Sequence, residues 1–340
     1  MLPNSSTIIH LTPELGSKLL ELSDGILIHQ YQNPLRGAFI CQHCFISVRQ
    51  GKVIGYAVIE LNRFHRSECW FGPILLDRRN VSYFWTDFHR QLKAHGIWQL
   101  SLQPLTDQDS EIFQDLVKNL KFVYCLKQGW ATAIKDISPP LDLLLKGYDP
   151  KHRYSIQRAK KLGITSRVIS DVKEFESLIR IFLTMFDQRK IHHYPSQLAS
   201  RLRGEFKYFQ YSGNGLVIGS YKEETLLGGI VLIISGSTAL YAYGAMNKND
   251  KEPVMHAAID HSFQLLKEIG ITTFDFGGYF LGQDDEQFIA LNRFKTRFSV
   301  TPVIYPSRLE LNTSRFHAKF LKLLLSMRNR YLKFKNKHVS

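Results

Sequence analysis

Hydrophobic positions along the first half of the chain recur with two periods, near two and near 3.6 residues, and predict both strands and helices. β-Branched and aromatic residues at 45–49 and 53–61 flank a Gln50-Gly51-Lys52 turn, which is typical of a β-hairpin. Helical spacing at 81–95 predicts an amphipathic helix, and Gly96 is a suitable residue to end it. The other predicted elements are helices at 13–22 and 109–119 and strands at 69–76, 98–102 and 123–134.

The second half of the chain repeats this order of elements. Strands are predicted at 216–221, 226–234, 238–244 and 272–276, with a helix at 253–267 before the last of them. Residues 92–97 (LKAHGI) align with 266–271 (LKEIGI) at an offset of 174, and Gly55 aligns with Gly228 at an offset of 173. Two features in the same order at nearly the same offset indicate an internal duplication. The predicted fold class is α/β (α+β), with two tandem domains that each have a mixed central sheet flanked by helices.

The domain boundary is predicted near Ser138-Pro139-Pro140, because consecutive prolines interrupt regular structure. We assign residues 1–146 to the first domain and residues 147–311 to the second. An inserted helical region follows the boundary, with predicted helices ending at Gly163, spanning 171–187, and beginning at Pro195. A last helix, within 312–340, is expected to pack back on the first domain.

Composition limits the classes of protein that this chain can be. It has 340 residues, of which 44% are hydrophobic, enough for two domains with real cores. It has no uninterrupted run of about 18 apolar residues, and its N-terminus lacks the pattern of a secretory signal. All four cysteines lie in the first half, which is typical of a reducing compartment. We therefore expect a cytoplasmic protein.

Positive charge is concentrated in the second half. Residues 1–150 hold 15 Lys and Arg against 14 Asp and Glu, whereas residues 151–340 hold 29 against 16. Eight of these cations, and no acid, lie between Arg315 and Lys337. Such a surface indicates a polyanionic partner, either nucleic acid or anionic lipid and pyrophosphate groups. The basic tail is interpreted either as a docked helix with a solvated face or as a contact with membrane or RNA.

The stretch from Ile271 to Phe298 holds the strongest candidate for chemistry. Its strand ends in Asp275 and the pair Gly277-Gly278, and glycines let backbone approach a ligand closely. Acidic residues 284–286 then open a helix, and its end reads RFKTRF at 293–298. A helix with a basic last turn is the simpler interpretation of this ending.

FDFGG, followed by a helix closing on RFK and a further Phe, resembles the Fem-type aminoacyltransferases. RYSIQRAKKLG at 153–163 also resembles the family's R-Y-x-I-R-K-A-x-K-x-G helix. The resemblance implies tandem acetyltransferase-like (GNAT) domains that add an amino acid from aminoacyl-tRNA to the stem peptide of a muramyl-peptide or lipid-linked peptidoglycan precursor. It implies no metal and no bound cofactor. We further expect a monomer that is cytoplasmic or, because of its basic C-terminal helix, peripheral at the inner face of the membrane.

The resemblance also assigns roles to individual residues. Lys295 matches the lysine that stabilises the donor carbonyl, as a fixed cation would do for a developing oxyanion, and Phe294 matches its aromatic neighbour. Arg293 is a candidate for binding phosphate. Arg189 resembles the arginine of a T-x-x-R pattern that grips the precursor's diphosphate or a carboxylate, and His193 replaces an aromatic four residues later. A helix-capping role for Arg189 is the alternative.

The remaining candidates are expected to bind substrate. Tyr241 and Tyr243 alternate in LYAYGAM and are therefore predicted to lie on one face of a strand, with Tyr243 the closer match to a substrate-contacting tyrosine. Core packing is the alternative for one of them. Arg36, Arg153 and Arg158 complete the predicted substrate contacts.

The chain departs from the family at Gln103-Pro104, where an acidic residue often precedes the proline, so a carboxylate base is missing. Two other functions therefore stay open, an acyl-CoA-dependent N-acyltransferase and a non-catalytic basic adaptor. Against the first, GAMNKNDKEPVMHAA after Tyr243 lacks the Q-x-x-G-x-G/A loop that cradles a pyrophosphate. A zinc site at Cys41-x-x-Cys44 is disfavoured, because structural zinc needs four ligands and the sequence has no second cysteine pair at a regular spacing.

Overall fold

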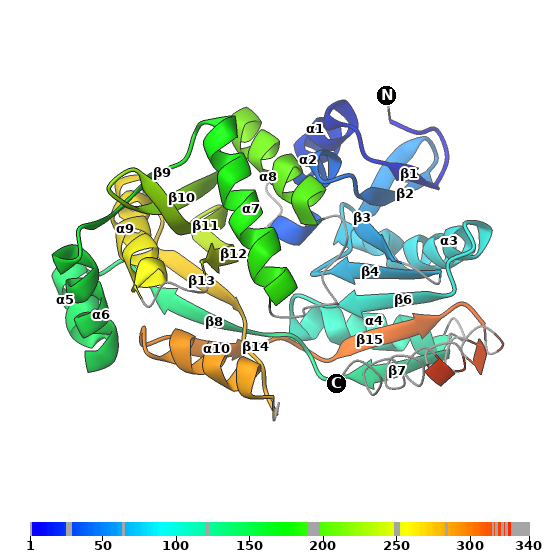
Figure 1. Ribbon diagram of the computed structural model, residues 1–340. Helices are drawn as coiled ribbons and strands as arrows, with labels where there is room; N and C mark the ends of the chain where they lie inside the picture. The colour runs from blue at the N-terminus through cyan, green and yellow to red at the C-terminus, as the bar shows by residue number, and fades with distance from the viewer. Residues whose placement is uncertain are drawn as a thin grey trace. The chain divides into compact units, whose positions relative to one another are not determined.

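The computed structural model describes residues 2–24, 29–62, 65–119, 123–188, 198–247, 252–282 and 285–314, with residues 316, 319, 320, 323, 326 and 327 (Figure 1). The chain forms two compact units. Unit 1 comprises Met1–Trp130 and Tyr305–Ser340, and unit 2 comprises Ala131–Ile304. No helix in the described part of the chain has the length and apolar character needed to cross a bilayer.

Unit 1 contains a sheet with the strand order β1-β2-β3-β4-β6-β15-β7, and β5 pairs with β3. Its strands are β1 (Thr7–His10), β2 (His43–Arg49), β3 (Lys52–Asn62), β4 (Arg66–Trp70), β5 (Ile74–Leu75), β6 (Gln99–Gln103), β7 (Val123–Lys127) and β15 (Arg308–Asn312). Its helices are α1 (Pro13–Leu22), α2 (Pro34–Phe39), α3 (Val81–Ala94) and α4 (Asp107–Asn119), with 3-10 turns at Gln30–Gln32 and Arg78–Asn80. β4 and β6 run parallel, which leaves their carboxyl ends at the same edge.

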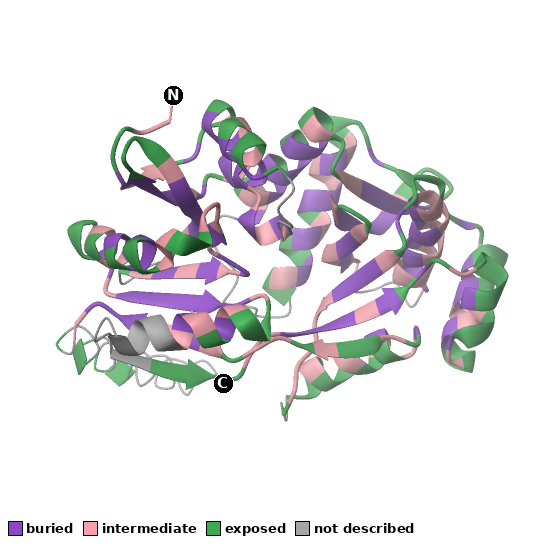
Figure 2. Cartoon of the chain, turned by 180° about the vertical axis from the view of Figure 1, so that it is seen from behind, coloured by how far each residue is buried: buried purple, intermediate pink, exposed green. Residues whose placement is uncertain are grey.

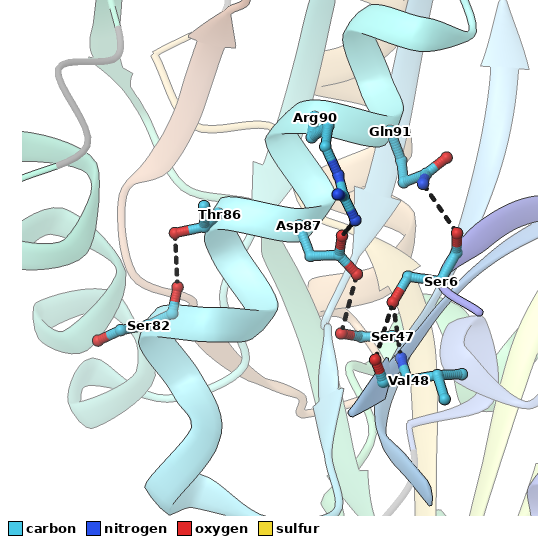
Figure 3. A network of polar contacts seen from close by, with 8 residues as sticks. All are labelled: Ser6, Ser47, Val48, Ser82, Thr86, Asp87, Arg90 and Gln91. Carbon is cyan, nitrogen blue, oxygen red and sulfur yellow. Dashed lines mark hydrogen bonds and ion pairs between the residues drawn. The ribbon is translucent and has the colours of Figure 1, made fainter. Parts of the chain in front are cut away.

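Helix α3 is fixed to the sheet of unit 1 by both apolar and polar contacts. Phe84 and Phe88 are fully buried against Phe45 of β2, with ring centroids 5.1 and 4.5 Å away. Beside them, Ser47 Oγ donates to the buried carboxylate of Asp87, which also pairs with Arg90 (Figure 3). These contacts hold α3 in one position along β2.

Unit 2 contains a sheet with the strand order β14-β8-β13-β12-β11-β10-β9. Its strands are β8 (Ala131–Asp136), β9 (Ile164–Val168), β10 (Gly215–Lys222), β11 (Thr225–Ser235), β12 (Thr238–Met246), β13 (Thr273–Gly278) and β14 (Thr301–Ile304). Its helices are α5 (Leu141–Gly147), α6 (Pro150–Lys161), α7 (Val172–Gln188), α8 (Leu198–Ser212), α9 (Val254–Glu268) and α10 (Glu286–Thr296). As in unit 1, two strands that are distant in sequence, β12 and β13, pair in parallel.

The sheet of unit 2 has helices packed against both of its faces. Ile230 and Leu232 of β11 belong to the same buried cluster as Ile259 and Phe263 of α9, and α6 packs against α9 and β9. Helices α7 and α8 contact β10, β11 and β12. Figure 2 shows the corresponding bands of buried residues on the strands and on the helix faces that cover them. The unit is thus a layered α/β structure with its core at the sheet.

The two units confirm the predicted duplication in detail. Strands β3 and β11 begin and end at positions that differ by 173, and each follows a hairpin partner with one bulge. The bulge lies in the same place in both hairpins: Ser47 pairs with Gly55 in β3, and Ser220 pairs with Gly228 in β11. Helices α3 and α9 then end at equivalent glycines with positive φ, +65° at Gly96 and +79° at Gly270.

Two predicted strands differ from the structure. The single strand predicted at 123–134 is wrong: β7 pairs with β15 in unit 1, whereas β8 pairs with β13 and β14 in unit 2. Gln128-Gly129-Trp130 separates the two strands, so the compact units divide at Trp130, earlier than the sequence predicted. The strand predicted at 69–76 is also interrupted, by Phe71 with a φ of +58° and the cis Gly72-Pro73 bond.

The described residues of the C-terminal segment are helical and partly exposed. The rings of Phe320 and Trp98, both in unit 1, have centroids 5.6 Å apart. Phe316, Leu323 and Met327 nevertheless keep 72%, 56% and 57% of their surface exposed. Because their spacing places them on one side of a helix, they form an apolar face with little cover among the described residues.

Candidate active site

The candidate active site lies where β12 and β13 separate. The two strands pair in parallel only from Thr238–Thr273 to Leu240–Asp275. Beyond that point β12 continues with β11 as far as Met246, while β13 stays with β8, where Gly278 pairs with Thr132. Ligands bind beyond the carboxyl ends of parallel strands at such points, because backbone groups there are released from the ladder.

Lys295 of α10 reaches into this region. Its Nζ donates to the carbonyl oxygen of Gly277 at 3.1 Å and also to that of Gly278, at the end of β13. The side chain is 8% exposed, and burial lowers its pKa to about 8, although the nearby Asp275 carboxylate favours the charged form. An ammonium group has three N–H donors, and no described residue accepts the third. The arrangement can therefore donate to a ligand oxygen.

Asp275 fixes the turn that holds Lys295. Its Oδ1 accepts hydrogen bonds from the Gly277 N–H at 2.7 Å and from the Thr132 hydroxyl. Burial raises the pKa of Asp275, and both hydrogen bonds and the charge of Lys295 oppose that rise. The same glycine that donates to Asp275 accepts from Lys295, so strand β8, the turn and α10 are joined through three side chains.

Gly277 meets two constraints that favour glycine. Its φ is +69°, and a Cβ at this position would lie 3.2 Å from the carbonyl oxygen of Tyr241. The following segment is held by Asn292 of α10, which accepts from the N–H of Phe280 at 3.0 Å and donates to its carbonyl at 2.7 Å. The loop after β13 is thus fixed to the same helix that carries Lys295.

The prediction that Tyr241 and Tyr243 share one face of β12 is wrong. Tyr241 pairs with Leu232 and Tyr243 with Val231, so a bulge at Ala242 turns the two side chains to opposite sides of the sheet. Tyr241 packs on the α9 side, with its ring near Phe276 and its hydroxyl against Gly244. Tyr243 packs on the α7 side, where its ring meets Phe182 edge-on at 6.3 Å.

Phe294 lies in a cluster with the buried His152 and the partly buried His256, which no local sequence pattern connects. His152 Nε2 donates to the Phe294 carbonyl at 2.9 Å, and His152 Nδ1 therefore accepts from His256 Nε2 at 3.1 Å. Burial lowers the pKa of both histidines, that of His256 to about 3. Both rings are neutral at pH 7, and they tie α6 and α9 to α10. Because His152 and His256 are about one hundred residues apart, no local sequence pattern indicates that they meet.

The predicted arginines occupy different environments. The Arg153 guanidinium donates to the carbonyls of Lys146 and Tyr148 and so closes the turn between α5 and α6. Arg158 and Arg293 are exposed on their helices, and neither has an ion-pair partner among the described residues. Arg36 is 2% exposed in unit 1, where it donates to the carbonyl of Gln30 at 3.2 Å and lies over the Tyr31 ring.

Gln103, at the carboxyl end of β6, is fully hydrogen-bonded within unit 1. Its Nε2 donates to the carbonyls of Pro104 and Pro306 at 3.0 and 2.9 Å, and its Oε1 accepts from the Trp130 N–H at 2.9 Å. A carboxylate could not make the two donor contacts. The amide at this position therefore joins three segments of unit 1, which the sequence did not reveal.

Aromatic side chains gather near Gln103, at the carboxyl ends of the parallel strands β4 and β6. Trp70 meets Trp130 edge-on at 5.4 Å, and Phe71 meets Tyr305 at 4.6 Å. Trp70, Trp130 and Tyr305 are only partly buried. The repeated strand arrangement places this cluster in unit 1 at the edge that corresponds to the Lys295 site in unit 2. No local sequence pattern indicates this cluster, because its members are far apart along the chain.

The remaining predicted residues either form no metal site or lie outside the part of the chain that the structure describes. Arg189 and His193 are among the residues that the structure does not describe. Cys44 is a buried thiol whose pKa is raised by burial, whereas Cys41 is exposed. Within the described residues there is no cluster of three or more His, Cys, Asp or Glu side chains suited to a metal ion.

Comparison with solved structures identifies the fold. The chain superposes on FemX with a TM-score of 0.65 at 15% identity, covering 89% of this chain and 96% of that one. The fold is that of a Fem-like tandem GNAT protein. L-PGS from Bacillus licheniformis gives a TM-score of 0.59 at 16% identity over 90% and 93% of the two chains. A tandem GNAT protein from the clavulanic acid biosynthesis pathway gives 0.54 at 10% identity over 91% and 99%.

In sequence, by contrast, no protein-family model matches the chain and no curated protein matches it. The tandem GNAT fold is consistent with the duplication and with the pair of parallel strands in each unit.

Proposed function

We propose that this protein is an acyltransferase that moves an aminoacyl group from aminoacyl-tRNA to the stem peptide of a peptidoglycan precursor. The observation that carries the proposal is the buried Lys295 ammonium, held by two glycine carbonyls where β12 and β13 separate. The tandem GNAT fold and the FDFGG and RFK sequences support the class of reaction. The proposed acceptor is a lipid-linked or UDP-linked muramyl peptide.

In the proposed reaction, an amino group of the acceptor attacks the ester carbonyl of the donor. A C–N bond forms and the ester C–O bond breaks, and its electron pair leaves with the ribose oxygen. The proton lost by the amine passes to that oxygen or to water, so the atoms balance without a further reactant. The third N–H of Lys295 would stabilise the oxyanion of the tetrahedral intermediate.

No side chain is assigned as general base. Gln103 stands where Fem-type enzymes often have an acid, but an amide does not accept a proton at neutral pH, and its hydrogen bonds are already used. The amine would reach the donor with its proton lost to solvent. The rate is therefore expected to rise with pH until Lys295 loses its own proton.

Roles for the other candidates follow from where they lie. Arg293 and Arg158 are exposed and suited to bind phosphate, whereas Arg36 in unit 1 and Arg153 in unit 2 hold backbone carbonyls and would stabilise their own segments of the chain. Tyr241 and Tyr243 lie on opposite sides of β12, so they would not contact the same ligand. Either each contacts a different ligand, or only one of them contacts substrate. Arg189 and His193 remain proposed contacts for the precursor's diphosphate or carboxylate.

An acyl-CoA donor is less well supported by the start of helix α9. GNAT domains that use CoA hold its pyrophosphate on backbone N–H groups at a helix N-terminus. Here the residue before α9 is Pro253, which has no N–H, and it is preceded by the carboxylate of Glu252. Lys222 pairs with Glu252 at 2.6 Å and compensates its charge, so the argument rests on the N–H that Pro253 lacks.

Contact with the inner face of the membrane is proposed for the C-terminal segment. Phe316, Leu323 and Met327 form the exposed apolar face described above, and the segment carries eight cations without an acid. An amphipathic helix of this composition binds anionic lipid surfaces. A cytoplasmic, peripheral protein would thereby be brought close to a lipid-linked precursor.

Transfer can be tested with defined donors and acceptors. Purified protein would be incubated with UDP-linked muramyl pentapeptide or its lipid-linked form, together with mixed aminoacyl-tRNAs or, separately, with acyl-CoAs. Mass spectrometry should show a gain of one amino-acid residue with the tRNA donors alone. Transfer from CoA alone, or no transfer to either acceptor, would contradict the proposal.

A further inference from the structure

Helix α6 presents a basic face of which only Arg158 has been given a proposed role above. Lys151, Tyr154, Arg158 and Lys161 occur at intervals of three, four and three residues, so they lie within an arc of about 80° around the helix axis. All four are exposed, and Tyr154 keeps 65% of its surface. We refer to these four side chains as the α6 stripe.

The stripe is free of ion pairs among the described residues. The one basic residue of α6 with a carboxylate partner is Lys160, which lies off the stripe and pairs with Asp260 of α9 at 3.6 Å. The acid nearest in sequence, Asp149, is the N-cap and accepts from the Lys151 N–H at 2.8 Å. The stripe therefore offers three uncompensated cations around an aromatic ring.

The composition of α6 distinguishes RNA from a lipid surface as the partner. A helix that binds a membrane inserts an apolar face. The apolar face of α6 is already buried, with Ile156 and Ala159 each 1% exposed in the interior of unit 2. The exposed face has cations for phosphates and one aromatic ring on which an unpaired base can stack. Both features match a nucleic-acid strand.

The length of the stripe fits a short unpaired end. Lys151 and Lys161 are separated by about 15 Å along the axis at 1.5 Å per residue. A stacked strand advances about 3.4 Å per nucleotide, so this length matches about four nucleotides. We infer that the α6 stripe binds the unpaired 3′ end of the RNA donor, with phosphates on Lys151, Arg158 and Lys161 and one base stacked on Tyr154. This inference rests on the proposed use of aminoacyl-tRNA.

Binding can be measured by fluorescence anisotropy with the full chain and two labelled probes. One probe is an RNA hairpin with an unpaired 3′-ACCA end, and the other is the same hairpin with a blunt end. Tyr154→Ala should weaken binding of the first probe about tenfold and leave the blunt probe unchanged, because stacking requires an unpaired base. Equal effects of Tyr154→Ala on both probes would contradict the inference.

The cations are tested against a matched control. Arg158→Gln/Lys161→Gln should weaken binding and reduce the salt dependence of log K by about 1.5, as expected for two lost phosphate contacts. Lys173→Gln/Lys207→Gln removes the same charge from exposed positions on α7 and α8, and should leave both quantities nearly unchanged. Equal losses in the two double variants would show non-specific attraction and overturn the inference. All these positions are exposed, so folding should be retained, which circular dichroism checks.

Two further measurements separate this inference from the proposed function. We take Arg158→Gln/Lys161→Gln as the stripe variant. If it loses binding to phosphatidylglycerol vesicles but retains RNA binding, the stripe binds lipid and the inference is contradicted. If wild-type protein transfers amino acids but the stripe variant keeps the wild-type KM for aminoacyl-tRNA, the inference is wrong and the function stands. If binding depends on the stripe but no transfer occurs, the inference stands and the function is wrong.

Discussion

Lys295 donates a hydrogen bond to the carbonyl oxygen of Gly277, 3.1 Å from its Nζ, and this contact joins α10 to the end of β13. Gly277 in turn donates to Asp275 at 2.7 Å. Because the ammonium group is anchored on two sides, its remaining N–H has a fixed direction. Such preorganisation costs no rearrangement when charge develops on a substrate, which is what oxyanion stabilisation requires.

The pH dependence of transfer should report the protonation of Lys295. Its pKa is lowered to about 8 by burial, so the cation is present at pH 7 and is lost as the pH rises above about 8. The acceptor amine needs the opposite change, so the single-turnover rate should rise and then fall. Rates measured from pH 6 to 10 should show the falling limb in wild-type protein and not in the residual activity of Lys295→Met. A rate that still rises past pH 9 would contradict this role.

Gly277→Ala should reduce both stability and activity. A non-glycine residue with φ near +69° costs about 1–2 kcal/mol, and the added Cβ would press on the Tyr241 carbonyl. Gly270→Ala is the matched control, because its φ is +79° but no atom lies within 4 Å of its added Cβ. Urea unfolding should show the larger loss for Gly277→Ala, and only that variant should lose activity per folded molecule. Equal behaviour of the two variants would mean that the turn does not position Lys295.

Gln103→Glu should destabilise unit 1 without creating a general base. The substitution removes two donor contacts and places carboxylate oxygens against the carbonyls of Pro104 and Pro306. A buried group left unsatisfied costs about 1–3 kcal/mol, which denaturant unfolding can measure. A variant of unchanged stability that transfers faster than wild type would instead show that this position is a vacant base site.

The hydrogen-bonded pair of His152 and His256 should make the protein less stable in mild acid. In the folded state the pKa of His256 is lowered to about 3, whereas an unfolded histidine has a value near 6.5. Between these values the unfolded state binds more protons, so stability is full above about pH 6.5 and falls as the pH is lowered.

The slope of this change is limited to about 1.4 kcal/mol per pH unit for one histidine. Unfolding free energies measured at pH 7, 6 and 5 should therefore fall in wild-type protein. His256→Gln should be less stable at pH 7 but show a flatter dependence. A His256→Gln slope as steep as that of wild type would assign the acid sensitivity to other groups.

The duplication could be predicted from sequence because short local patterns indicate each repeated element. The repeated glycines at 55 and 228 mark hairpins, and Gly96 and Gly270 end equivalent helices, so strand and helix periods were enough to find both units. The tail strand β15 was not foreseen. It pairs with β6 and β7, more than one hundred and eighty residues earlier, and only tertiary structure reveals such a partner.

The site was predicted less completely than the fold. Lys295 and Phe294 stand out because they belong to a short motif, but the facing direction of Tyr241 and Tyr243 depends on a bulge at Ala242. A bulge adds one residue to a strand without changing its hydrophobic composition, so alternation alone predicted the wrong side. Likewise, Thr132 contacts Asp275 across two strands, and no sequence spacing could indicate that pair.

The most direct test compares two lysines that both hold backbone carbonyls. Lys295 holds those of Gly277 and Gly278, whereas Lys267 donates to the carbonyls of Ile137, Ser138 and Pro139, outside the proposed site. Single-turnover transfer from aminoacyl-tRNA to muramyl pentapeptide should fall about 100- to 1000-fold in Lys295→Met. It should stay near the wild-type rate, per folded molecule, in Lys267→Met. A Lys295→Met protein as fast as wild type would contradict the central claim.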